Sequence, residues 1–210
     1  WAAKRLGQRA VVRMPAGTAY SRLENIRKEG AEVTIEAMNY DDCVRLAARE
    51  AAQTPGGVLM QDTAWEGYEQ IPAWIMQGYC TMGLEAYEQL PQKPTHIFLQ
   101  AGVGSMAGAM AGFFSACYGE DRPFITIVEP NRADCLFRTA KANDGKLHNV
   151  TGDMNTIMAG LACGEPCSLG WDILKNHADA SPVEGNIPTG KGTHINAVDD
   201  DIAACGLNLF

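Results

Sequence analysis

The chain has 210 residues, of which 46% are apolar and 20% charged, a composition typical of soluble globular proteins and unlike that of disordered ones. Its 17 basic and 25 acidic residues give a net charge of −8, which argues against nucleic acid or anionic lipid as a partner. No apolar run reaches the roughly 20 residues that cross a bilayer, so no membrane partner is expected.

The N-terminal part of the chain alternates short β-type runs with helical patterns. Residues 1–6 resemble the last turns of a helix closed by Gly7, which suggests missing upstream sequence. Asn39 or Asp41 can cap a helix. The patterns predict a helix at 18–29, a further helix from 39 or 41 onward, and strands at 10–14, 32–36 and 58–61.

The same alternation continues through the second part of the chain. The patterns predict strands at 96–100 and 124–128, and helices at 71–90, 105–117, 133–139, 156–162 and 169–178. Connections of this length imply parallel strands joined by crossover helices. The sequence therefore predicts an α/β fold, a three-layer α/β/α sandwich built on open parallel sheets.

Three segments are expected along this fold. A soft boundary falls at Asp62–Tyr68, where the first run of units ends, so residues 1–65 are assigned to a small α/β domain. Residues 66–180 are assigned to part of a larger one. Residues 181–210 are rich in Gly, Asp, Asn and Pro and are expected to form a loosely ordered, divergent tail.

The seven cysteines are scattered, and Cys163 and Cys167 are the only close pair. One such pair without suitably spaced histidines predicts no metal site. A Cys163–Cys167 disulfide, or one between Cys135 and Cys163, stays an alternative. The cysteine number is odd and no secretory signal precedes them, which favours a reducing, cytoplasmic location.

The sharpest motif is a glycine-rich turn, residues 100–108 (QAGVGSMAG), between an apolar strand and a helix of small residues. Glycine allows positive φ and close approach of the backbone to a ligand, and the free amides of a helix N-terminus favour a phosphate. The alternative is a tight turn whose glycines serve packing alone. The spacing matches neither a P-loop nor a complete dinucleotide fingerprint.

A second motif, Asp62–Tyr68 (DTAWEGY), follows the strand expected at 58–61. Ligands of parallel α/β sheets bind beyond the carboxyl ends of strands, so the Asp62 carboxylate could take a proton from a substrate carbon. The alternative is that Asp62 caps a turn or the next helix.

Several strings together resemble the 2,3-diaminopropionate ammonia-lyase family, a group of fold-type-II pyridoxal-phosphate enzymes. They occur in order between Trp1 and about Ala178: WAAKRLGQRAVVRMP, MNYDDCVRL, DTAWEGY, IPAWIMQGY, QAGVGSMAG, IVEPNRADC and GDMNTIMAGLACGEPCSLGW. The resemblance implies a fold like that of the tryptophan synthase β-subunit, with the cofactor between two α/β domains. It also implies a chain incomplete at both ends.

The resemblance assigns roles to particular residues. Asp62 corresponds to the base that removes the α-proton of the L-substrate, and Tyr40 to a substrate-binding residue. Glu129 and Pro130 are expected on the cofactor side of the cleft. The pyridoxal 5′-phosphate group is expected on a loop of consecutive residues, Gly102, Val103, Gly104, Ser105, Met106 and Ala107.

The implied reaction is α,β-elimination of 2,3-diaminopropionate to pyruvate and ammonia, a carbon–nitrogen lyase activity of amino-acid catabolism, by a parent enzyme that is a homodimer. The family's Schiff-base lysine lies upstream of the matched region, and the lysines of this chain fall at other positions. The chain alone is therefore expected to be inactive. The alternatives are another fold-type-II serine or threonine dehydratase, or a non-catalytic module that binds a phosphate ligand.

Overall fold

The computed structural model describes residues 1–176, 187–190 and 193–200. The chain divides into two compact units, Trp1–Leu59 and Met60–Phe210, each with its own sheet. The division falls shortly before the expected boundary segment, so Asp62 belongs to the second unit.

The first unit is built on two parallel strands, β1 (Val11–Met14) and β2 (Glu32–Ile35). Helix α1 (Ala2–Arg5) precedes them, α2 (Tyr20–Lys28) connects them and α3 (Tyr40–Gln53) follows. These elements confirm the strand–helix–strand order predicted for this part of the chain, with ends displaced by a few residues.

Local chemistry explains where α3 begins. The side-chain Oδ1 of Asn39 accepts a hydrogen bond from the backbone N–H of Asp42 at 2.8 Å, so Asn39 is the N-cap. This bond satisfies one of the amides that the first helical turn leaves without a partner. The prediction that Asn39 or Asp41 opens this helix is therefore resolved in favour of Asn39.

The core of the first unit is small. Leu23, Val33 and Cys43, one from each of α2, β2 and α3, are its buried apolar side chains. Arg13 of β1 is mostly buried and pairs with Glu32 and Glu50, at 3.2 and 2.9 Å. Two carboxylates thus compensate the one guanidinium that the unit buries.

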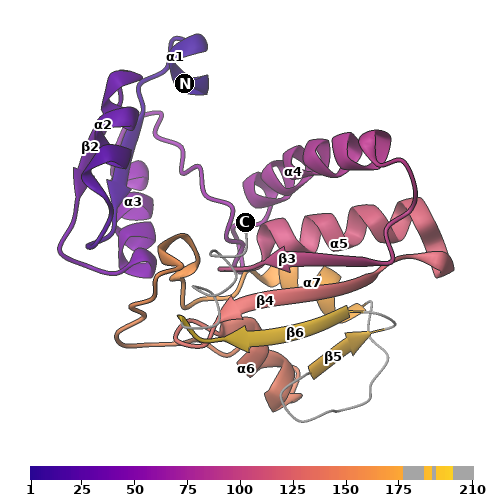
Figure 1. Ribbon diagram of the computed structural model, residues 1–210. Coiled ribbons are helices and arrows are strands. Elements are labelled where there is room, and N and C mark those ends of the chain that lie inside the picture. Colours follow the sequence, from indigo (N-terminus) through magenta and orange to yellow (C-terminus); the bar gives the residue numbers. More distant parts are fainter. Residues whose placement is uncertain (177–186, 191–192, 201–210) are drawn as a thin grey trace. The chain divides into compact units, whose positions relative to one another are not determined.

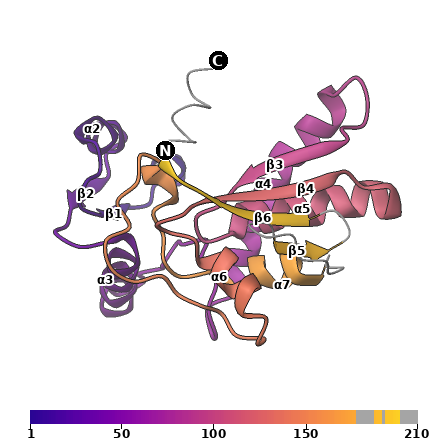
Figure 2. The same cartoon turned by 60° about the horizontal axis from the view of Figure 1, so that its bottom comes forward.

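The second unit contains a four-stranded sheet in the order β3-β4-β6-β5 (Figure 2). The strands β3, β4 and β6 are parallel, and β5 runs antiparallel to β6. Their bounds are β3 His96–Gln100, β4 Phe124–Pro130, β5 Ile187–Gly190 and β6 Thr193–Val198. The two strands predicted at 96–100 and 124–128 are confirmed.

Strands β5 and β6 correct the expectation of a loosely ordered tail from residue 181. Strand β6 pairs with β4 along its length, from Ile125 opposite Thr193 to Pro130 opposite Val198. The side chain of Ile195 is completely buried. A short segment with weak local signals becomes a strand because a neighbouring strand supplies its hydrogen bonds, which composition cannot show. The rest of that tail, residues 181–186, 191–192 and 201–210, lies outside the described residues.

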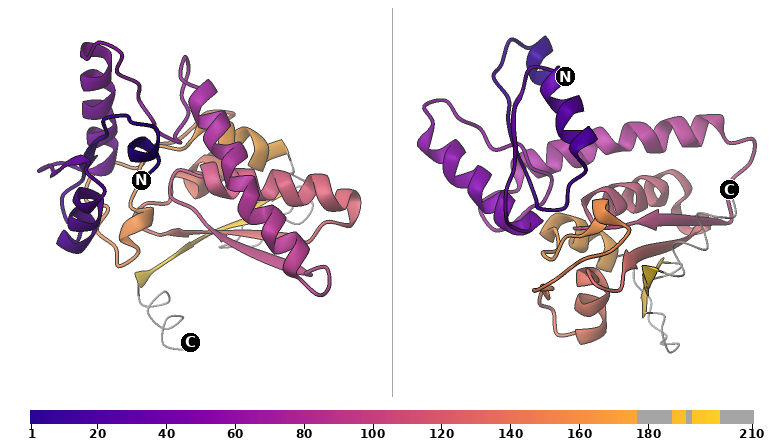
Figure 3. Two further views of the ribbon diagram at one scale, coloured as in Figure 1. Left: turned by 90° about the horizontal axis from the view of Figure 1, so that it is seen from above. Right: turned by 60° about the vertical axis from the view of Figure 1, so that its left-hand side comes forward.

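Helices cover both faces of this sheet, as Figures 1 and 3 show. Helices α5 (Ser105–Tyr118) and α7 (Ser168–Asn176) lie on one side, and α6 (Cys135–Ala142) lies on the other. Helix α4 (Gln70–Gln89) packs against α5. The unit is thus a three-layer α/β/α arrangement, which confirms the predicted fold class.

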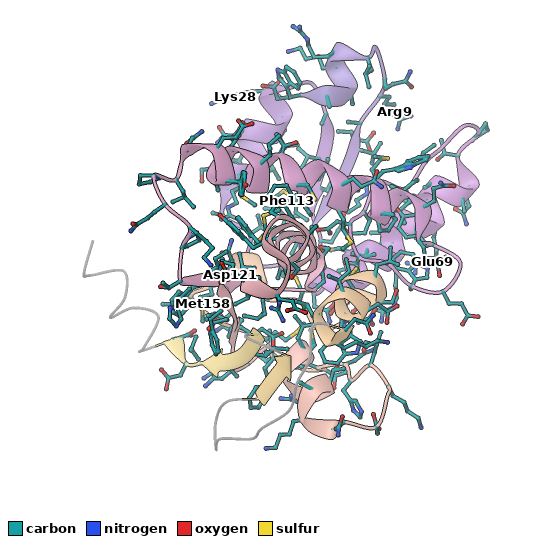
Figure 4. The ribbon with its side chains drawn as sticks, turned by 90° about the vertical axis from the view of Figure 1, so that its right-hand side faces the viewer. Arg9, Lys28, Glu69, Phe113, Asp121 and Met158 are labelled. Atoms are coloured by element: carbon teal, nitrogen blue, oxygen red, sulfur yellow. The ribbon has the colours of Figure 1, made fainter. Side chains whose placement is uncertain are left out.

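The α4–α5 contact depends on a glycine. A Cβ on Gly83 would lie 2.7 Å from the Phe113 ring, so the ring of α5 occupies the space that the glycine leaves. Figure 4 looks along α5 and shows Phe113 between the two helices. This contact brings α4 close to α5, and both helices contribute side chains to the site around Asp62.

One predicted strand is absent from the structure, and one predicted helix is shorter than expected. Residues 58–61 form no strand, and Val58 and Met60 are 64% and 69% exposed. Among the described residues no strand pairs with this segment, and a strand needs such a ladder. The helix predicted at 156–162 reduces to a 3₁₀ turn, Ala159–Leu161, after the Thr156 hydroxyl accepts the N–H of Met158. A further 3₁₀ turn, Gly119–Asp121, follows α5.

The core of the second unit lies between the sheet and its helices. It consists mainly of aliphatic side chains with no measurable exposure, from β4, α6, α7 and β6: Ile125, Ile127, Leu136, Leu174 and Ile195. None of the helices among the described residues is long and apolar enough to cross a membrane.

Candidate active site

The glycine-rich turn joins the carboxyl end of β3 to the N-terminus of α5. Ala101 still donates its N–H to Val128 of the neighbouring strand at 2.9 Å, and the chain then leaves the sheet. Gly104 is the N-cap of α5 and has φ +95°, a conformation that side chains with a Cβ rarely adopt. The turn therefore needs a glycine at position 104 for its backbone alone.

The amides of this turn are available to a ligand. In the described part of the chain, no protein acceptor is bonded to the N–H groups of residues 102–107, and the first α5 bond runs from Gly108 to Gly104. Consecutive amides at the N-terminus of a 14-residue helix form a site for an anion such as a phosphate. This geometry favours the phosphate interpretation over glycines that serve packing alone.

Packing does explain another pair of glycines. A Cβ on Gly170 of α7 would lie 2.6 Å from the carbonyl oxygen of Gly104 and 3.1 Å from the nitrogen of Ser105. A Cβ on Gly108 would lie 2.8 Å from Gly170. The backbone of α7 thus contacts the turn directly, and this contact fixes where the amides point.

Asp62 lies beside the turn. Its Oδ2 accepts a hydrogen bond from the hydroxyl of Ser105 at 2.6 Å and a second from the hydroxyl of Tyr79 at 2.8 Å. Ser105 is both the first residue of α5 and a member of the predicted phosphate loop. The predicted catalytic carboxylate and the predicted phosphate loop therefore belong to one site.

The backbone around Asp62 is held by the N-terminus of α7. The buried sulfur of Cys167 accepts the N–H of Ala64 at 3.3 Å, and its thiol lies 3.6 Å from the carbonyl oxygen of Asp62. The N–H of Cys167 donates to Val103 at 2.7 Å, and that of Ser168 donates to Ala64 at 3.1 Å. One turn of α7 thereby ties the Asp62 segment to the glycine turn.

Two titratable groups near this segment differ from their ordinary behaviour. Burial, followed by the hydrogen bond to Asp62, raises the pKa of the Tyr79 hydroxyl well above its usual value. Burial also raises the pKa of the Cys167 thiol. Tyr79 is therefore a hydrogen-bond donor at neutral pH, and Cys167 is a packed thiol rather than a nucleophile.

One buried polar atom beside Asp62 has no partner. The hydroxyl oxygen of Thr63 is buried and makes no hydrogen bond within the described residues. Buried hydroxyls usually have a partner, so this one has a free hydrogen for a water or a ligand beside Asp62.

Glu129 stabilises the start of α6. Its carboxylate is completely buried at the end of β4 and accepts the N–H groups of Leu136 and Phe137, at 3.0 and 2.7 Å. It therefore caps α6. Burial raises the pKa of Glu129 to about 8, although these donors oppose the change.

Tyr40 is the first residue of α3 and belongs to the first unit, so its substrate-binding role stays a prediction. Cys135, Cys163 and Cys167 are free thiols, which removes both alternative disulfides. Among the described residues, no group of three or more His, Cys, Asp or Glu side chains could hold a metal ion.

Sequence reasoning missed two members of the site. Tyr79 and Cys167 both lie in strings that carry the family resemblance, IPAWIMQGY and CGEPCSLGW, but nothing in their spacing relates them to Asp62. Tyr79 and Cys167 both contact Asp62, from which they are separated by 17 and 105 positions in the sequence.

An apolar cavity of about 350 Å³ lies between α4, β3 and α5, apart from this site. Met82, Ile97 and Phe114 are among the residues that line it.

A three-layer α/β/α unit with a glycine-rich, phosphate-type turn beside a carboxylate defines a class of cofactor-dependent enzyme. The sequence matches the family described as "Pyridoxal-phosphate dependent enzyme" over residues 1–185, and the chain belongs to that family. It is similar to the diaminopropionate ammonia-lyase of Salmonella typhimurium, with 54% identity across 94% of this chain and 50% of the relative.

Further comparisons also find diaminopropionate ammonia-lyases. The diaminopropionate ammonia-lyase of Escherichia coli is 47% identical across 100% of this chain and 49% of its own length. A crystal structure of the Escherichia coli enzyme with an aminoacrylate–PLP azomethine reaction intermediate superposes with a TM-score of 0.83 at 44% identity, covering 100% of this chain and 49% of that one. The chain spans about half the length of the curated relatives it matches.

The residues present fit the phosphate end of pyridoxal phosphate. The unpaired amides of the turn, at the N-terminus of α5, are the groups that would hold it. The close backbone contact with Gly170 keeps that cradle in shape.

Proposed function

We propose that this chain carries the cofactor-phosphate loop and the proton-accepting carboxylate of a pyridoxal-phosphate-dependent carbon–nitrogen lyase. The proposed reaction converts 2,3-diaminopropionate and water to pyruvate and two molecules of ammonia. The observation that carries the proposal is the bond between Ser105 and Asp62, because it joins the phosphate loop to a candidate base. The identity to diaminopropionate ammonia-lyases over nearly the whole chain supports the choice of substrate.

The residues of this chain would act at two places, the phosphate of the cofactor and the α-carbon of the substrate. The turn at residues 102–107 would hold the phosphate, and Asp62 would take the α-proton through Oδ1, which has no partner among the described residues. Pyridoxal phosphate, when bound, withdraws electrons from the substrate's α-carbon. Loss of the α-proton then allows the β-amino group to leave as ammonia.

The wider assignment follows the same resemblance. Residues 1–65 and 66–180 would belong to the small and large domains of the enzyme, with a divergent end at 181–210. Tyr40 would contribute to substrate binding from the small domain. We further infer a homodimeric, cytoplasmic enzyme, with an amino acid as its small-molecule substrate.

The phosphate site can be tested on the 210-residue chain by calorimetric titration with pyridoxal phosphate and with pyridoxal. The chain should bind pyridoxal phosphate at least tenfold more tightly, since several charge-assisted hydrogen bonds depend on the phosphate. Inorganic phosphate should compete. Equal affinity for the two ligands, or none for either, would remove the basis for assigning the turn to the cofactor.

The reaction can be tested in a chimera in which this chain replaces the matched half of the Salmonella relative. Pyruvate release from 2,3-diaminopropionate should exceed that from serine. Asp62→Asn should lower turnover by about 10²- to 10⁴-fold, the usual contribution of a general base, and leave cofactor affinity within about threefold. A preference for serine would instead support a serine dehydratase, and full activity of Asp62→Asn would exclude this carboxylate as the base.

A further inference from the structure

Tyr79 belongs to the site by geometry but has no part in the reaction described above. We propose that Tyr79 is a positioning residue, which together with Ser105 holds the Asp62 carboxylate in one orientation and leaves its Oδ1 for proton transfer. This inference rests on the proposed function, because it gives the carboxylate the role of base.

The two hydrogen bonds to Asp62 share one acceptor. Both hydroxyls, that of Tyr79 at 2.8 Å and that of Ser105 at 2.6 Å, donate to Oδ2. A carboxylate oxygen has two lone pairs, so these donors use the capacity of Oδ2. The second oxygen makes no hydrogen bond with any described residue. The arrangement thus separates an oxygen that is held from an oxygen that can react.

The two donors come from different helices that pack together. Ser105 begins α5 and is 2% exposed, so its hydroxyl has little freedom. Tyr79 lies within α4, and α4 is held close to α5 where the Phe113 ring fills the space beside Gly83. Two donors on separate rigid elements hold Oδ2 from two sides, which restricts rotation of the Asp62 side chain more than one donor would. Such preorganisation is what a catalytic group requires.

The alternative is that the Tyr79 ring only fills space. Tyr79→Phe separates these roles because it keeps the ring and removes the hydroxyl. Ser105→Ala removes the other donor. Tyr87→Phe is a matched control, since Tyr87 lies on the same helix and its ring packs against Tyr118, away from Asp62.

The orientation of Asp62 can be measured by NMR on the full 210-residue chain with labelled aspartate and tyrosine. The three-bond couplings of Asp62 should indicate a single side-chain rotamer in the unmodified chain and in Tyr87→Phe. They should become averaged in Tyr79→Phe and in Ser105→Ala. The ring Cζ resonance of Tyr79, identified by its loss in Tyr79→Phe, should move in Asp62→Asn because its acceptor has changed.

In the chimera assay, Tyr79→Phe should lower turnover about tenfold and leave the KM and the affinity for pyridoxal phosphate unchanged. A single Asp62 rotamer in Tyr79→Phe, or unchanged turnover, would overturn the positioning role even if the chimera is an active lyase. Absent cofactor binding in the unmodified chain would instead reject the proposed function. If the chain binds no cofactor, averaged Asp62 couplings in Tyr79→Phe would show only that Tyr79 holds Asp62 in place. The positioning role in catalysis would then be rejected as well.

Discussion

Gly170→Ala tests whether backbone contact between α7 and the glycine turn builds the anion site. The new Cβ would lie 2.6 Å from the Gly104 oxygen, 2.8 Å from its carbonyl carbon and 3.1 Å from the Ser105 nitrogen. Ordinary contacts between carbon and oxygen begin at about 3.3 Å, so the backbones must separate by roughly 0.7 Å. No flexible side chain can absorb this change, because all three atoms belong to the backbone.

The magnitude follows from two opposing effects. Overpacking at a rigid contact costs up to about 3 kcal/mol. Replacing a glycine by alanine within a helix stabilises the folded state by at most about 1 kcal/mol. The net loss is therefore about 2 kcal/mol, which lowers the urea midpoint by about 1 M at a typical slope. The separation would also misdirect the amides next to Gly104, and the loss of one charge-assisted bond weakens phosphate binding by tenfold or more.

Two measurements check this prediction. Urea unfolding can be followed by tryptophan fluorescence, which reports mainly on the second unit because it contains Trp65, Trp74 and Trp171. Calorimetric titration with pyridoxal phosphate gives the affinity. Gly78→Ala is the control: a Cβ there meets nothing within 4 Å, so stability should rise slightly and affinity should not change. A Gly170→Ala chain as stable as the unmodified one, with equal affinity, would refute the reasoning.

Two further predictions concern stability. Asn39→Ala should cost about 1 kcal/mol, because the N–H of Asp42 loses its acceptor at the start of α3, whereas Asn39→Asp should retain most of the stability; urea unfolding followed by circular dichroism compares them. Glu129 holds a proton in the folded state up to about pH 8, whereas the unfolded chain releases it above about pH 4.3. The free energy of unfolding should therefore fall between these pH values, by up to about 1.4 kcal/mol per pH unit from this group. The difference in unfolding free energy between the unmodified chain and Glu129→Gln, measured from pH 5 to 8, should follow that slope, and a constant difference would contradict it.

The elements with strong local signals were predictable from sequence. β3 and β4 are apolar runs bounded by polar residues, and α5 follows the Gly102–Gly104 turn, so each occurs where the pattern placed it. β6 was missed because its strand character depends on pairing with β4. The strand expected at 58–61 failed for the converse reason, since β-type residues without a neighbouring strand form no ladder.

The site was predicted in part for the same physical reason. The glycine turn and Asp62 are recognisable because a turn with positive φ and a carboxylate after an apolar run carry local meaning. Tyr79 and Cys167 carry no such local signal, because their roles depend on contacts between residues far apart in the sequence. The resemblance placed Glu129 on the cofactor side of the cleft, but its bonds to the amides of Leu136 and Phe137 likewise depend on contacts that the sequence does not show.

The sulfur of Cys167 offers a way to time the opening of this region. It has no exposed surface, and the chain on either side of it is bonded to Val103 and Ala64. An alkylating reagent can reach it only when the α7 terminus separates from both segments. The rate at which this one thiol is modified, located by mass spectrometry, therefore reports how often α7 separates from the glycine turn in the native protein.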